Sequence, residues 1–102
     1  MKTKFIADQV LLQIEDDEDR DMSVFASMEI VVVRSADNAI VETIPASPGG
    51  NGNKTIIADR NTAADCFTVE GQHTYHAAVA DAGGDTHTVG LKYLNILAVP
   101  GV

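Results

Sequence analysis

Residues 24–34 constrain the fold more than any other segment, because they are rich in β-branched side chains and apolar on both faces. In an extended strand, successive side chains point to opposite faces of the sheet. One face then holds Met28, Ile30 and Val32, and the other holds Glu29, Val31 and Val33. A strand that is apolar on both faces indicates either the centre of a sheet or a surface covered by another subunit.

The rest of the chain shows the same short extended segments, separated by turn-forming residues. Tight turns are predicted at 36–38 and 81–85, where Asp, Asn and Gly gather between apolar segments. Strands are predicted over 4–14, 24–34, 39–44, 54–58, 66–69, 72–80 and 86–98. This pattern predicts an all-β fold, a small antiparallel sandwich or barrel of about seven strands, within a single domain covering 1–102.

Two strand assignments are less regular than the others. Segment 4–14 fits a helix or a strand, but its cations come first and its acids last, which is the wrong polarity for a helix dipole. We therefore expect a strand there, with Val10, Leu12 and Ile14 on one face. Near the end of the chain, the alternation changes frame at Tyr93-Leu94, which predicts either a β-bulge or a strand buried on both sides.

Two long loops are predicted from composition. Residues 15–23 begin with six acids in seven positions, and their mutual repulsion favours a solvated acidic loop. Residues 45–53 combine two prolines with three glycines and two asparagines, which favours an exposed Gly/Asn loop.

The charge of the chain excludes several classes of function. Seven Lys and Arg against 15 Asp and Glu give a formal net charge of −8, and the cations are scattered. Nucleic acids and anionic membrane surfaces bind clustered cations, so neither is an expected partner. No apolar segment approaches the roughly 20 residues of a membrane span, and Asp8 interrupts the N-terminal apolar residues, so no signal peptide is expected.

The acidic loop contains the strongest pattern for a metal site. Asp17, Asp19 and Asp21 stand at alternate positions, as calcium ligands often do. An EF-hand loop counted from Asp17 would need Gly and Glu where the chain has Met22 and Met28. We therefore expect no bound metal or other cofactor, and these three residues are the candidates for a calcium site outside the EF-hand class.

The other chemically active residues do not form a recognisable catalytic motif. His73 and His76 point to opposite faces of a strand, so surface histidines are expected rather than a metal site completed by His87 and the turn acids. Cys66, the only cysteine, is expected to be a buried apolar side chain. Residues 49–55 end in Lys-Thr like a phosphate loop, but no helix is predicted after them. We expect no enzymatic activity.

The acidic composition, the core of small side chains, the Gly/Asn loops and the long first strand together resemble small tailed-phage virion proteins, of the capsid decoration or head–tail neck type. The resemblance implies a structural protein of the virion, assembled in the host cytoplasm. It also implies a symmetric oligomer, often a trimer, that binds the major capsid protein or another virion protein.

A set of apolar residues is expected to form the partner interface. These are the second face of the strand at 24–34 and the apolar C-terminus, namely Val31, Val33, Leu97, Val99 and Val102. The alternative function is a small binding module for carbohydrate or calcium, with the loops at 15–23, 45–53 and 81–85 as the contact surface. The absence of Trp counts against carbohydrate binding.

Overall fold

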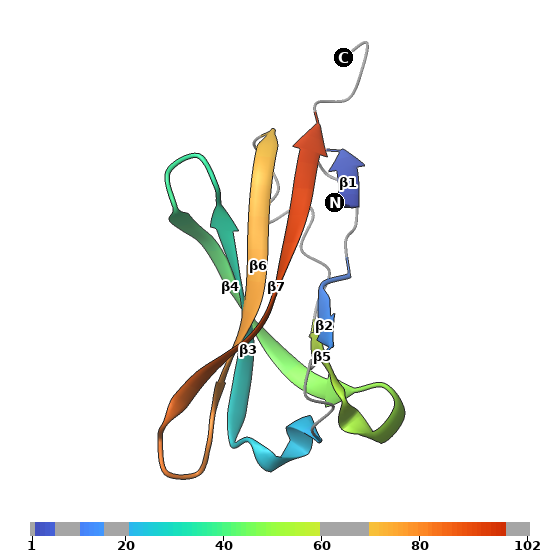
Figure 1. Ribbon diagram of the computed structural model, residues 1–102, viewed down its shortest axis with the longest axis vertical. Helices are drawn as coiled ribbons and strands as arrows, with labels where there is room; N and C mark the ends of the chain where they lie inside the picture. The colour runs from blue at the N-terminus through green and yellow to red at the C-terminus, as the bar shows by residue number, and fades with distance from the viewer. Residues whose placement is uncertain (1, 6–10, 16–20, 60–69, 98–102) are drawn as a thin grey trace.

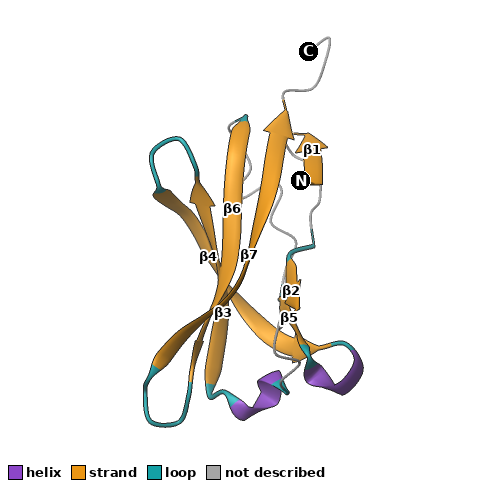
Figure 2. Cartoon of the chain, viewed as in Figure 1, coloured by secondary structure: helices purple, strands orange, loops and turns teal. Residues whose placement is uncertain are grey.

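The computed structural model describes the backbone of residues 2–5, 11–15, 21–59 and 70–97, and the side chains of all of these except 2–5. Strands dominate these ranges, and the only helical elements among them are two short 3-10 segments (Figure 2). The all-β prediction is therefore confirmed. None of the described helices is long and apolar enough to cross a membrane.

Seven described strands form one strongly curved sheet. In chain order they are β1 (Lys2–Phe5), β2 (Gln13–Glu15), β3 (Ser27–Arg34), β4 (Ala39–Gly49), β5 (Thr55–Ala58), β6 (Gly71–Ala80) and β7 (Thr86–Leu97). Their order in the sheet is β1-β7-β6-β3-β4-β5-β2. Every neighbouring pair is antiparallel except β1 and β7, which run parallel. Figure 1 shows β4 crossing from the side of β3 toward β5 and β2.

The curvature brings the far edge of the sheet over β7. A Cβ atom added to Gly90 of β7 would lie 2.5 Å from Cγ2 of Ile14 in β2, so the two strands are in close contact. The enclosed space is filled by aliphatic side chains, together with Met22 and Tyr75. The core consists of Leu12, Ile14, Met22, Ile30, Val32, Ile44, Ile56, Ala58, Tyr75, Ala77, Val79, Val89, Leu94 and Ile96.

The two predicted hairpins are present. The turn between β3 and β4 is fixed by Asp37, whose Oδ2 accepts a hydrogen bond from Nη2 of Arg34 at 2.8 Å and whose Oδ1 accepts one from the backbone of Ala39. In the turn between β6 and β7, Oδ1 of Asp81 accepts hydrogen bonds from the backbone N–H groups of Gly83 and Asp85, both at 3.0 Å. Asn and Asp residues in turns commonly bind the backbone in this way.

Two predicted strands begin or break differently from the expectation. The single strand over 4–14 is wrong, because β1 ends at Phe5, Leu11 and Leu12 lie outside any strand, and β2 begins at Gln13. Leu12 and Ile14 are nevertheless both buried, and Val10 lies outside the described residues. The strand expected from residue 24 starts at Ser27, because a 3-10 turn over Met22–Val24 precedes it.

The predicted Gly/Asn loop over 45–53 is also corrected. Strand β4 continues through Pro45 and Pro48 to Gly49 and pairs with β5, and only a short turn around a 3-10 segment at Asn51–Asn53 separates the two. The pairing of β4 with β3 ends at Pro45, so residues 46–49 have a strand on one side only. Proline is tolerated where one side of a strand makes no ladder hydrogen bonds.

The predicted irregularity of the last strand is real, but it lies earlier. Tyr75 pairs with Lys92 and Ala77 pairs with Val89, so the extra residue of β7 falls at Gly90 and Leu91 rather than at Tyr93-Leu94. Gly90 has a φ of 65°, which glycine adopts without strain. Because of the bulge, the residues of β7 that face the core are Val89 before it and Leu94 and Ile96 after it. All three are buried.

Candidate interaction face

The outer, convex face of four adjacent strands is the most distinctive surface of the molecule. Registers between β4, β3, β6 and β7 align their outward side chains in rows that cross all four strands. The upper row consists of Ile40, Val33, Thr74 and Tyr93. The middle row consists of Thr43, Val31, His76 and, at the bulge of β7, Leu91. The lower row consists of Pro45, Glu29, Ala78 and Thr88. These twelve residues are called the outer face below.

Large apolar side chains of the outer face are in contact with water. Ile40 is 67% exposed, Leu91 is 55% exposed and Tyr93 is 48% exposed. They come from the two strands that flank β3 and β6, so they border the face on both sides. Scattered exposed apolar residues are normal on a protein, whereas gathered ones indicate contact with another molecule.

The outer face is also almost free of charge. Among its twelve positions there is one carboxylate, that of Glu29, and there is no Lys or Arg. The chain as a whole has 22% charged residues and a net charge of −8, so the outer face has a smaller share of charged residues than the whole sequence. Depletion of charge, rather than hydrophobicity alone, is the compositional signal of the centre of a protein–protein interface.

The predicted interface residues fall partly on this face. Val31 and Val33 occupy it, but Val31 is only 8% exposed because the neighbouring strands already cover it. Leu97 is 38% exposed at the end of β7, where its backbone pairs with Phe5 of β1. Val99 and Val102 lie outside the described residues.

The interface predicted from the sequence did not include Ile40, Leu91 or Tyr93. Their exposure depends on which strands are neighbours, and on the bulge that turns them outward. The hairpin at 36–38 does bring Ile40 opposite Val33. That pairing was a signal available in the sequence.

Of the three candidate calcium ligands, the described part of the chain includes Asp21 alone. Asp17 and Asp19 lie outside it. Asp21 caps the 3-10 turn, where its Oδ1 accepts hydrogen bonds from the backbone N–H and the hydroxyl of Ser23, and these bonds lower the pKa of Asp21. No group of three or more His, Cys, Asp or Glu side chains suited to a metal ion occurs among the described residues.

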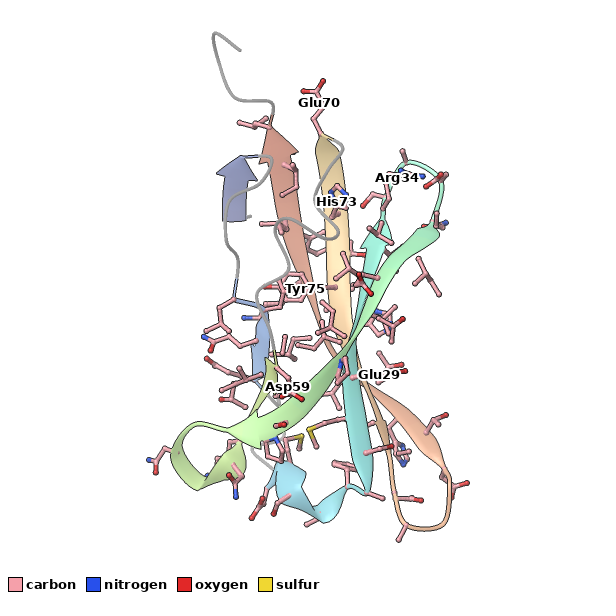
Figure 3. All side chains as sticks on the ribbon, turned by 180° about the vertical axis from the view of Figure 1, so that it is seen from behind. Glu29, Arg34, Asp59, Glu70, His73 and Tyr75 are labelled. Atoms are coloured by element: carbon pink, nitrogen blue, oxygen red, sulfur yellow. The ribbon has the colours of Figure 1, made fainter. Side chains whose placement is uncertain are left out.

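The three histidines occupy different environments. His76 faces outward on β6, and His87 lies in β7 with its Nε2 3.7 Å from Oδ2 of Asp81 and its ring 6.0 Å from that of Phe25. His73 was expected at the surface, but it is 1% exposed and shares the inner face of β6 with Tyr75 (Figure 3). Its Nδ1 lies 3.1 Å from the carbonyl oxygen of Gly71, which satisfies one ring nitrogen inside the barrel.

The remaining candidates add no ligand site. Residues 49–55, which end like a phosphate loop, form the end of β4, a tight turn and the start of β5, so a strand follows rather than a helix. Burial raises the pKa of Tyr75, which is a core residue. Cys66 lies outside the described residues. A shallow hollow at the lower end of β3, β6 and β7 is lined by small side chains and by Met28, Glu29 and Val79.

Comparison with known proteins informs the fold alone. No family model matches the chain, and no relative is found among curated proteins. Among solved structures, the chain is similar to CopC from Methylosinus trichosporium OB3b, with a TM-score of 0.54 and 11% sequence identity. The similarity covers 100% of this chain and 90% of that protein. It supports the same β-sheet architecture and assigns no site.

Proposed function

We propose that this chain is a non-enzymatic assembly protein, of the capsid-decoration kind that its sequence resembles. It oligomerises and binds a larger protein shell, with the virion as its location. The observation that carries the proposal is the outer face, a charge-depleted sheet surface with large exposed apolar side chains in an otherwise acidic protein.

An exposed apolar face favours association with another molecule. Covering Ile40, Leu91 and Tyr93 removes apolar area from water, which stabilises an assembly by about 25 cal/mol per Å². The net charge of −8, which comes from acids elsewhere in the sequence, favours solubility of the unassembled chain. A protein that joins others through one neutral face needs no catalytic group.

In two of the turns that the alternative binding module would use, carboxylate oxygens already accept hydrogen bonds from the turn itself. Oδ1 of Asp81 binds two backbone N–H groups, and Asp21 binds Ser23. These bonds serve the folding of the turns, so the described loops supply no observation that favours carbohydrate or calcium as a ligand.

The proposal is tested by binding to a shell. The genes beside this one are expected to encode capsid or portal proteins, and the purified chain is expected to co-sediment with shells made from that capsid protein. Saturable co-sedimentation at a fixed number of copies per shell supports the proposal. A chain that stays in the supernatant with such shells, or whose neighbouring genes encode no virion protein, contradicts it.

A further inference from the structure

We propose that the turn between β4 and β5 holds a site of spontaneous covalent modification, the side-chain amide of Asn51, which converts to a carboxylate over time in solution. The turn projects from the sheet, and Asn51 and Gly52 are both exposed (Figure 1). The reaction needs no enzyme and no reactant other than water. The inference goes beyond the proposed function and does not depend on it.

The reaction is an intramolecular attack on the side-chain amide. The backbone nitrogen of Gly52 loses its proton and bonds to Cγ of Asn51, the Cγ–Nδ2 bond breaks, and Nδ2 leaves with a proton as ammonia. The product is a cyclic succinimide, which water opens at either carbonyl to give aspartate or isoaspartate. No atom is oxidised or reduced in these steps. Reactions of this kind are fast when the two reacting atoms can meet freely.

The turn leaves both reacting groups free. The hydrogen bond that closes it runs from the N–H of Asn53 to the carbonyl oxygen of Gly50 at 3.4 Å, so it does not engage the nitrogen of Gly52. Within the described ranges, neither this nitrogen nor the side chain of Asn51 is hydrogen-bonded to another residue. Glycine has no Cβ, so no side chain of its own hinders the nitrogen.

Two other asparagines precede nitrogens that the fold restrains. The N–H after Asn38 belongs to Ala39 and donates to Oδ1 of Asp37 at 3.2 Å. The nitrogen after Asn95 belongs to Ile96, a buried residue that is paired with strands on both sides. Attack by either nitrogen would require part of the fold to give way first, so we expect both asparagines to react slowly.

Asn53 is the nearest internal comparison, because it lies in the same turn and is exposed as well. Its side-chain amide donates a hydrogen bond to the carboxylate of Asp21. The nitrogen after it belongs to Lys54, whose Cβ hinders the approach that glycine leaves open. The two asparagines of this turn therefore share the same chemistry and differ in their surroundings.

The test follows the folded chain over time at mildly alkaline pH, where loss of a backbone proton is favoured. The tryptic peptide 35–54 contains Asn38, Asn51 and Asn53 together. Its fragmentation in a mass spectrometer shows which side chain has exchanged NH₂ for OH. We expect Asn51 to convert at least about tenfold faster than either of the other two, because only its reacting groups are unrestrained.

The same chain unfolded in urea is the control for the structure. We expect folded and unfolded chains to convert Asn51 at rates within about tenfold of each other, whereas unfolding accelerates the conversion of Asn38. Asn51→Gln lengthens the side chain by a methylene and is expected to lower conversion at this position at least about tenfold, without changing co-sedimentation with shells.

Two outcomes overturn the inference. One is a folded chain that keeps Asn51 unmodified while the unfolded chain converts it, and the other is equal conversion of Asn38 or Asn53 in the folded chain. Neither outcome bears on the proposed function, which is judged by co-sedimentation with shells.

Discussion

At the scale of single residues, a few side chains fix the geometry of this sheet. Asp37 and Asp81 hold the two hairpin turns through side-chain oxygens that accept backbone hydrogen bonds. Gly90 allows the bulge in β7, because it adopts a backbone conformation that other residues avoid and because it leaves room for Ile14. These positions decide where the strands turn and which side chains reach the outer face.

The ion pair of the first hairpin predicts a pH dependence. The hydrogen bond from Arg34 is the largest cause that holds the pKa of Asp37 below its usual range. A carboxyl with a lowered pKa in the folded state adds stability that is present above its unfolded pKa of about 3.9 and is lost as the pH falls. We expect the amide resonance of Ala39 to shift below that pH in NMR spectra. In Arg34→Gln the transition should move to higher pH, and an unchanged midpoint would contradict the assignment.

Gly90→Ala is expected to destabilise the fold by about 1–3 kcal/mol, since it combines a left-handed φ with a Cβ placed 2.5 Å from Ile14. Urea denaturation followed by circular dichroism measures the loss. Gly84→Ala is the matched control, because Gly84 also has a positive φ but has no atom within 4 Å of the added Cβ. The two variants separate backbone strain from the steric clash, and equal losses would show that the contact with β2 contributes nothing.

At the scale of elements, the hairpins could be predicted from the sequence and the pairing of distant strands could not. Turn-forming residues lie next to the strands they connect, so 36–38 and 81–85 were found directly. The parallel pairing of β1 with β7 joins segments almost a whole chain apart, and no local pattern encodes it. The extension of β4 through two prolines depends on having β5 on one side only.

The same division applies to the candidate site. Val31 and Val33 were predicted as interface residues because their strand is apolar on both faces. Their neighbours on β4 and β6 follow only from the registers between the strands. His73 shares the more apolar face of its strand with Tyr75, Ala77 and Val79, so the alternation already indicated its burial, although a histidine is less often buried than an aliphatic residue. The position of the bulge was ambiguous, since several residues could have absorbed the change of frame.

The turn between β6 and β7 gives a prediction for one element. Asp81→Ala removes the acceptor of two backbone hydrogen bonds and is expected to destabilise the protein by about 1 kcal/mol. The loss should be concentrated at the end of the hairpin, where hydrogen exchange of the amides of Gly83 and Asp85 should accelerate. Asp85→Ala keeps the acceptor and removes an equal charge from the same turn. If it accelerates exchange equally, charge rather than hydrogen bonding controls the turn.

At the scale of the whole molecule, two nearby isoleucines of β4 have opposite roles. Ile44 is fully buried in the core, and Ile40 is exposed on the outer face. The fold thus separates the side chains that stabilise the monomer from those proposed to bind a partner.

Ile44→Ala is expected to lower the free energy of unfolding by about 2–5 kcal/mol, because it leaves a cavity in the core. Ile40→Ala is expected to change it by less than about 0.5 kcal/mol when measured at a dilution where the chain is monomeric. Chemical denaturation of both variants checks this difference. A large loss in Ile40→Ala would mean that its side chain supports the monomer, and a small loss in Ile44→Ala would mean that the core is loosely packed.

The parallel pair at the edge of the sheet also governs the order in which the protein can form. β1 emerges first from the ribosome among the described strands, yet its backbone partner β7 emerges last. The hairpins β3–β4 and β6–β7 join neighbours in the chain and can form early, whereas the β1–β7 ladder requires closure of a loop spanning most of the chain. Among the described strands, β7 is the one neighbour of β1, so we expect the β1–β7 ladder to form after the two hairpins.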